Sequence, residues 1–269
     1  MIQQNSYLME HEEESLRLEM KTDIEEVKRQ AQWAGIRSGM SVLDVGCGSG
    51  ITTRALAELV GPKGHATGLD ISSKRIEYAA SHHQLPNNTF VVHDIRRPYL
   101  QDKAFDAVWS RFFIEYFRAD QFSIVKNILT PLSPGGVACL SDLDNNSIGH
   151  FGMSDRLKTS LTNIMDILER DFDFDPYAGR KIFGYLFDLG FLDIDCNVKT
   201  HHLLFGELSE KDRYNWERKI DVAVKKTGYD FDEYGGDYYL FRKEVLAFLE
   251  SPRRFTYTPL IMVRGIKKG

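Results

Sequence analysis

The sequence has few cysteines, no long apolar run and no excess of positive charge, and each absence removes a class of protein. The three cysteines, Cys47, Cys139 and Cys196, lie far apart and make neither a CxxC nor a Cys/His spacing, so we expect no metal site. No stretch approaches the roughly 20 apolar residues of a membrane span, and the polar, acidic residues 1–14 do not resemble a secretory signal. We therefore expect a cytoplasmic protein without a membrane partner.

The charge balance argues against nucleic acid as a partner. Lys and Arg total 34 against 39 Asp and Glu, which gives a formal net charge of -5. Proteins that hold a phosphate backbone normally show a basic surplus or a clustered basic face. The basic pairs here, such as Arg96-Arg97, are short and isolated, as solvated surface charge often is. With 42% hydrophobic and 27% charged residues, the composition is that of an ordinary globular domain.

Strand-like and helix-like segments alternate over the first half of the chain. Short apolar or β-branched runs are followed by segments in which apolar residues recur at helical spacing. This alternation predicts βαβ units, and therefore a doubly wound, mostly parallel α/β sheet with helices on both faces. A capping box, Thr22-x-x-Glu25, starts the first helix. Strands are expected at residues 41–45, 66–69, 89–93, 105–109 and 136–140, and further helices at 51–60, 72–81 and 119–129.

The alternation ends after Asp144, where helices dominate. Two later strands, at 192–205 and 255–265, would complete a seven-stranded, Rossmann-like sheet. Because the chain shows no internal repeat and no linker, we expect a single domain over residues 1–269. Its core is predicted at residues 20–144, 177–205 and 253–267, with helical insertions at 145–176 and 206–252 that form a lid.

A glycine-rich loop carries the strongest chemical signal. Residues 42–50 read Val-Leu-Asp-Val-Gly-Cys-Gly-Ser-Gly, which is a buried strand that runs directly into alternating glycines and then a helix. Glycine lets the backbone approach a ligand closely, and a helix N-terminus offers unpaired N–H groups. The dinucleotide pattern GxGxxG needs a glycine where this chain has Ile51, so the observed pattern is GxGxG.

Together with three later stretches, this loop resembles the class I S-adenosylmethionine-dependent methyltransferases. The similarity covers about residues 20–142 and includes Gly-Leu-Asp-Ile-Ser at 68–72, Val-Val-His-Asp-Ile at 91–95, and Phe-Asp-Ala-Val-Trp-Ser at 105–110 with Leu-Ser-Pro-Gly-Gly at 132–136. The resemblance implies that Asp70 accepts the ribose hydroxyls and that Asp94 accepts from the adenine amino group. Ile71 and Ile95 would hold the adenine ring between them. Asp70 could alternatively act as a helix N-cap.

The N-terminal stretch Glu14–Leu18 is similar to an element that small-molecule methyltransferases place over the cofactor. Tyr7 would cover the pocket there, and Arg17 would meet the methionine carboxylate. The family often has Gln three residues after that Arg, where this chain has Met20. The resemblance thus implies a site for S-adenosylmethionine built from Tyr7, Arg17, Asp44, Gly46, Cys47, Gly48, Asp70, Ile71, Asp94, Ile95 and Ser110.

Methyl transfer mainly requires that the acceptor atom be held in line with the methyl group, and a hydroxyl acceptor usually also needs a base. Arg111, Glu115 and Tyr116, after the fourth strand, are the catalytic candidates. The segment Ser-Arg-Phe-Phe at 110–113 lacks the Asp/Asn-Pro-Pro-aromatic turn of nucleic-acid amino-methyltransferases. We therefore expect a small-molecule acceptor, methylated on O, N or C, and leave open a homodimer.

Two other functions are compatible with parts of the pattern. One is a nicotinamide-dependent oxidoreductase, which Ile51 disfavours. The other is a regulator that binds the cofactor without turnover. A further hypothesis concerns residues 229–239, in which acidic and aromatic side chains alternate. As part of the lid, this segment would capture a cationic acceptor or one with an aromatic face; a solvated surface loop is the alternative.

Overall fold

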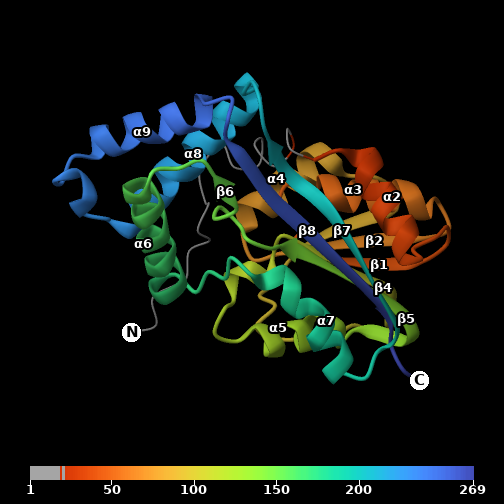
Figure 1. Cartoon of the computed structure of the whole chain (residues 1–269). Coiled ribbons are helices and arrows are strands. Elements are labelled where there is room, and N and C mark those ends of the chain that lie inside the picture. Colours follow the sequence, from red (N-terminus) through yellow and green to blue (C-terminus); the bar gives the residue numbers. More distant parts are fainter. Residues whose placement is uncertain (1–18, 20–21) are drawn as a thin grey trace.

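The computed structural model describes residue 19 and residues 22–269, so the predictions for Tyr7, Arg17 and Met20 lie outside the described residues. Its described strands form one sheet in the order β3-β2-β1-β4-β5-β8-β6, and β7 pairs with β8 (Figure 1). Strands β1 to β5 are parallel, and β8 is antiparallel to its neighbours. The strands are β1 (Ser41–Val45), β2 (His65–Asp70), β3 (Asn88–Val92), β4 (Phe105–Arg111), β5 (Leu132–Leu143), β6 (His150–Phe151), β7 (Leu192–Leu204) and β8 (Phe255–Ile266).

The seven predicted strands are present, and the two-residue β6 makes the sheet eight-stranded instead of seven-stranded. This extra strand pairs with Phe255 and Thr256, at the start of β8. Sequence periodicity could not indicate it, because two residues are too few to show an alternation. The mostly parallel, doubly wound α/β class is confirmed.

Helices cover both faces of the sheet (Figure 1). On one face lie α2 (Ile24–Ala34), α3 (Ile51–Val60) and α4 (Ser73–His83), and on the other lie α5 (Gln121–Leu129) and α7 (Ala178–Asp188). The N-cap of α2 is Asp23, whose carboxylate accepts from the Glu26 backbone N–H at 3.1 Å, and not the predicted Thr22. Asp and Thr are both favourable N-cap residues, so the sequence alone does not determine which of the adjacent residues Thr22 and Asp23 caps the helix.

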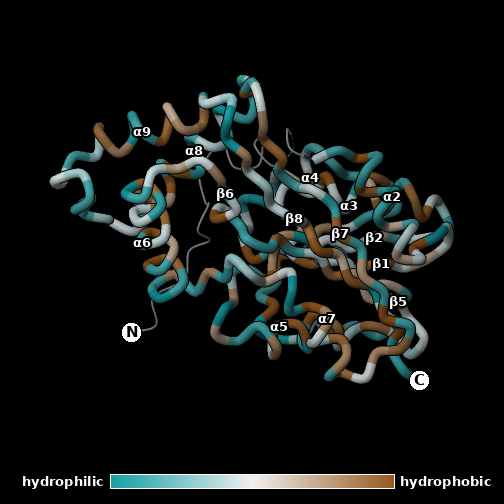
Figure 2. Tube along the Cα trace, in the orientation of Figure 1, coloured by the Kyte–Doolittle hydropathy of each residue, from teal (hydrophilic) through white to brown (hydrophobic). Residues whose placement is uncertain are grey.

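The middle strands bury both faces. Along β4 and β5, Val108 and Leu140 pack toward α5 and α7, whereas Trp109 and Cys139 pack toward α2 and α3. This alternation follows from the two-residue period of a strand. Figure 2 shows the same distribution, with apolar residues along the central strands and hydrophilic residues on the outer turns of the helices.

The two insertions gather at one end of the sheet (Figure 1). They contain α6 (Asp155–Asp171), α8 (Glu210–Thr227), the short 3-10 helix η2 (Asp232–Tyr234) and α9 (Tyr238–Glu250). Their apolar faces share a second hydrophobic cluster, in which Leu157, Trp216 and Phe241 are buried. We call this assembly of α6, α8, η2 and α9 the lid. No helix within the described part of the chain is both long and apolar enough to cross a bilayer.

Candidate active site

The loop between β1 and α3 takes a conformation that glycine favours. Gly46, Gly48 and Gly50 have φ angles of 76°, 55° and 88°. Such positive values are costly for residues with a Cβ atom. A Cβ at Gly46 would also collide with the ring of Phe113, and one at Gly50 would come within 2.5 Å of the Ala79 Cβ. The alternating glycines therefore fit a tightly packed loop at the carboxyl end of β1.

Asp70, the last residue of β2, holds this loop in place. Its Oδ2 accepts from the Gly48 backbone N–H at 3.0 Å, and its Oδ1 accepts from the Ser72 N–H at 2.9 Å. Arg75 Nη1 lies 3.4 Å from Oδ2. Ser72 is the N-cap of α4, so Asp70 does not have that role. A carboxylate has about four lone-pair sites, and three of them are used by Gly48, Ser72 and Arg75, so the carboxylate retains capacity for one further hydroxyl donor.

The residues that follow β2 and β3 differ from the predicted adenine clamp. Ile71 is 52% exposed at the rim of the sheet, whereas Ile95 is 4% exposed and packs in the core cluster below α5. The burial of Ile95 disfavours the predicted sandwich of one ring between Ile71 and Ile95, which stays a prediction. Asp94 itself is partly buried, and both its oxygens accept from Arg96 Nε at 2.9 and 3.0 Å. That ion pair holds the pKa of Asp94 below its ordinary value, although burial acts in the opposite direction.

Asp44, Cys47 and Ser110 support the loop from behind. Asp44 Oδ2 accepts from Thr53 Oγ1 at 2.6 Å, and burial raises the pKa of this carboxyl to about 7. Ser110 Oγ donates to the Val45 carbonyl at 3.0 Å. The Cys47 thiol is buried, which raises its pKa. These three side chains are nearly inaccessible, so they are placed to support the loop, and their direct contact with a ligand stays a prediction.

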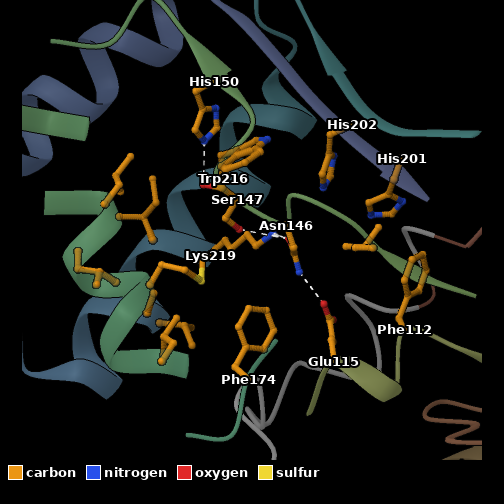
Figure 3. Close-up of a pocket in the computed structure, with 18 of the residues that line it drawn as sticks. Phe112, Glu115, Asn146, Ser147, His150, Phe174, His201, His202, Trp216 and Lys219 are labelled. Carbon is orange, nitrogen blue, oxygen red and sulfur yellow. Dashed lines mark hydrogen bonds between the residues drawn. The ribbon is translucent and has the colours of Figure 1, made fainter. Parts of the chain in front are cut away.

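A cavity of about 170 Å³ lies between the lid and the carboxyl ends of β4 and β5 (Figure 3). Leu157, Ile164 and Leu168 of α6 and Val245 and Phe248 of α9 provide much of an apolar wall. The catalytic candidates Arg111, Glu115 and Tyr116 all line it. The sequence named these three residues as catalytic candidates without indicating a cavity, and the structure places all three on the wall of one cavity.

Three polar side chains form a hydrogen-bonded chain along this cavity (Figure 3). Lys219 Nζ of α8 donates to Asn146 Oδ1 at 2.5 Å, and Asn146 Nδ2 donates to Glu115 Oε2 at 2.7 Å. Burial raises the pKa of Glu115, although Lys219 and Asn146 act in the opposite direction. The chain connects the lid to the short 3-10 helix η1 (Ile114–Tyr116), which carries Glu115.

Asp142 of β5 fixes η1. Its Oδ2 accepts from the backbone N–H groups of Phe113 and Glu115 at 3.1 and 3.0 Å, and its Oδ1 accepts from that of Leu143 at 2.8 Å. Burial and the neighbouring Glu115 raise the pKa of the Asp142 carboxyl. Because Asp142 orients the backbone on both sides of Ile114, it determines where Glu115 enters the cavity.

Aromatic rings and histidines form another part of the cavity wall (Figure 3). His150 meets the ring of Trp216 edge-on, with 5.1 Å between the ring centroids. Its Nδ1 is hydrogen-bonded to Thr256 and its Nε2 to the Ser147 carbonyl. Burial lowers the pKa of His150 to about 4, so the ring is neutral near pH 7.

Arg111 lies where β4 ends and the cavity begins. Its guanidinium carbon is 4.5 Å from the centroid of the Phe112 ring, and Phe112 has a φ of 55°. Such a backbone is uncommon for a bulky residue and turns the chain sharply after the strand. Burial lowers the pKa of Arg111 to about 10, which still leaves the guanidinium charged near pH 7.

Several residues of the cavity were not predicted. Asn146, Lys219, His201, His202 and Trp216 line it, but they come from segments far apart in the sequence. The polar run at 144–147, directly after a predicted buried strand, is a signal that could have indicated Asn146, because ligands bind beyond the carboxyl ends of parallel strands. Lys219 lies on an ordinary charged helix face, and its role follows only from how α8 packs.

Residues 229–238 do not line the cavity, so the prediction that their side chains capture the acceptor is wrong. Phe231 and Tyr234 are buried inside the lid. Glu233 accepts from Ser160 Oγ at 2.7 Å and from Asn163 Nδ2 at 3.0 Å, both on α6. The segment therefore braces α6 against the rest of the lid.

The fold and the loop define a nucleotide-binding domain of the Rossmann-like type. Residues 42–136, which contain the glycine loop and Asp70, match the family described as Methyltransferase domain. Demethylmenaquinone methyltransferase of Staphylococcus aureus is 36% identical over 115 residues, which are 42% of this chain and 47% of that protein. The chain thus spans about half the length of the curated relatives that it matches.

Solved structures share the fold. Phosphoethanolamine N-methyltransferase 2 of Haemonchus contortus, in complex with S-adenosyl-L-methionine, has a TM-score of 0.57 and 18% identity, covering 91% of this chain and 53% of that chain. The 4+2 cyclase SpnF has a TM-score of 0.55 and 19% identity, covering 91% and 82%. At such identities the likeness concerns the fold alone. Residues 42–136 therefore form a methyltransferase domain, and the chain shares its fold with S-adenosylmethionine-dependent methyltransferases.

Proposed function

We propose that this protein transfers a methyl group from S-adenosylmethionine to a small-molecule acceptor bound in the cavity under the lid. One observation carries the proposal: the two sites adjoin. Ser110 pairs with Val45, the residue before the glycine loop, and the next residue along β4, Arg111, lines the cavity. A ligand on the loop and a molecule in the cavity would therefore meet at the end of β4.

The loop fits a nucleoside cofactor. The Asp70 carboxylate faces the loop at the carboxyl end of the sheet, where it retains the capacity to accept from a ribose hydroxyl. Ile71 offers an exposed apolar side chain next to it. In this proposal Gly46 and Gly48 contact the cofactor through their backbone and Asp94 through its carboxylate, whereas the side chains of Asp44, Cys47 and Ser110 shape the loop.

In this proposal, S-adenosylmethionine supplies an electrophilic methyl group on a positively charged sulfur. Glu115 accepts the proton that the acceptor atom loses, since a carboxyl with a raised pKa is better matched to proton exchange near pH 7. Arg111 and Tyr116 contact the acceptor and orient it. The apolar side chains of α6 and α9 exclude water from the reaction.

The Staphylococcus aureus relative supports a small-molecule acceptor, because demethylmenaquinone is a small molecule. The fold alone would not, since it also occurs in the cyclase SpnF. We further propose a single domain over residues 1–269 that acts in the cytoplasm without nucleic acid or membrane partners. A homodimer is compatible with this proposal.

A thermal-shift comparison tests the cofactor. We expect S-adenosylmethionine and S-adenosylhomocysteine to raise the melting temperature, and NADH and NADPH to leave it unchanged. Equal stabilisation by NADH would favour the oxidoreductase. A metabolite screen for release of S-adenosylhomocysteine then tests turnover. Cofactor binding without release for any acceptor would favour the non-catalytic regulator.

A further inference from the structure

Charge is distributed unevenly along the cavity wall. Among the described residues that line it, the charged ones are Arg111, Glu115 and Lys219. Arg111 remains protonated near pH 7, because its lowered pKa is still about 10. The wall therefore has a surplus of one positive charge if Glu115 is ionised and of two if Glu115 is protonated. The whole chain, by contrast, has a formal charge of -5.

The histidines that line the cavity leave the net charge of its wall positive. His150 is held neutral near pH 7 by burial, and protonation of any of the three lining histidines would add positive charge. Asp142, the carboxyl group that supports η1, does not line the cavity. A cationic acceptor would therefore meet two fixed cations in a largely apolar enclosure, where charges interact more strongly than in water.

Lys219 is the cation best placed to bind an acceptor. It reaches from α8 into the cavity, where Nζ is hydrogen-bonded to Asn146 Oδ1 and lies 5.3 Å from the centroid of the Trp216 ring. An ammonium group has three donors. Trp216 is 3% exposed, and its Nε1 has no hydrogen-bond partner among the described residues. A buried donor beside a cation favours an oxygen acceptor.

The rest of the wall determines the body of the ligand. Leu157, Leu161 and Ile164 of α6, with Val245 and Phe248 of α9, present aliphatic and aromatic surface to the cavity. A small hydrophilic ion would leave this surface without contacts. The cavity consequently combines a largely apolar wall with the cationic side chains of Lys219 and Arg111.

We infer that the acceptor is an apolar, ring-sized molecule that carries one anionic oxygen group, and that Lys219 binds this group. The inference rests on the proposed methyl transfer only in calling the ligand a methyl acceptor, since binding of an anionic ligand by Lys219 does not itself require methyl transfer. It places the anionic group at the junction of the lid and η1, so that binding of the ligand joins the two parts of the site. A carboxylate and an ionised phenol share the chemistry that Lys219 recognises.

Two probes with the same ring test the inference on the full chain. We expect 2-naphthoate to bind at least about 10-fold more tightly than 2-naphthylmethylammonium in calorimetric titrations. Lys219→Met should lower the affinity for 2-naphthoate by about 10-fold or more, while Lys219→Arg should keep it within about threefold. Lys225→Met, on the exposed side of the same helix, is the matched control for loss of one charge.

Tighter binding of the ammonium probe, absence of binding by the carboxylate, or equal effects of Lys219→Met and Lys225→Met would each overturn the inference. The two-probe comparison on the unsubstituted protein remains decisive if Lys219→Met does not fold. A titration with S-adenosylhomocysteine keeps the two proposals apart. If the carboxylate binds through Lys219 but S-adenosylhomocysteine does not bind, the proposal of methyl transfer is refuted and the inference of an anion site is retained.

Discussion

Replacement of Asp70 by alanine probes the cofactor loop most directly. The Asp70 carboxylate accepts from the Gly48 and Ser72 N–H groups at 3.0 and 2.9 Å. The variant loses the charged acceptor proposed for the ribose and also releases the loop. Because a hydrogen bond to a charged group contributes about 1.5–3 kcal/mol, we expect a loss of about 2–3 kcal/mol in cofactor binding. That loss corresponds to a roughly 30- to 140-fold higher Kd.

Calorimetric titration with S-adenosylhomocysteine measures this change. Asp102→Ala, which removes an exposed carboxylate elsewhere, is the control and should leave the Kd unchanged. The variant should also melt at a lower temperature without ligand, because the buried Gly48 N–H loses its acceptor. Titrations therefore belong well below that melting temperature. A folded Asp70→Ala protein with a Kd within twofold of the original would refute the ribose assignment.

Three other perturbations have predictable outcomes. Below pH 6.5 His150 is protonated in the unfolded chain, whereas in the folded protein it is not protonated until about pH 4, so acid lowers the free energy of unfolding. In His150→Gln we expect this acid-induced loss to be smaller by about 3 kcal/mol, measured by urea unfolding at pH 7 and pH 4. Gly50→Ala, which crowds Ala79, should destabilise by at least about 2 kcal/mol in the same assay. Glu233→Ala frees Ser160, and should speed hydrogen exchange in α6 without changing cofactor affinity.

Each of these has a contrary result that is easy to recognise. An unchanged pH dependence in His150→Gln would mean that another group controls acid stability. A Gly50→Ala protein as stable as the original would contradict the packing of the loop against α4. Unchanged exchange rates in α6 after the Glu233 substitution would show that the brace does not hold that helix.

The sheet was predictable because its signals are local. Residues 41–45 and 51–60 form a strand and a helix at the predicted positions, since the apolar run and the helical spacing are properties of short segments. The glycine loop was predictable for the same reason. Ile95 was not, because the direction of a side chain beyond a strand end depends on where the chain turns, and no periodicity describes that turn.

The cavity was only partly predictable. Arg111, Glu115 and Tyr116 could be singled out because residues directly after a parallel strand lie at the ligand-binding edge. The contact between Lys219 and Asn146 joins residues 73 positions apart, on a lid helix and on a loop after β5. It results from the packing of the lid helices against one another. Apolar spacing predicts that these helices pack, but it does not predict which element each helix packs against.

The position of β8 also determines the order in which the molecule can be completed during synthesis. Strand β8 lies between β5 and β7, although it follows every other described element in the chain. Until the ribosome has released residues 255–266, residues 137–143 of β5 and most of β7 lack these ladder partners. Open strand edges of this length favour association between chains. Nascent molecules would therefore need protection from aggregation at this stage, and substitutions that weaken β8 should lower the yield of folded protein before they affect catalysis.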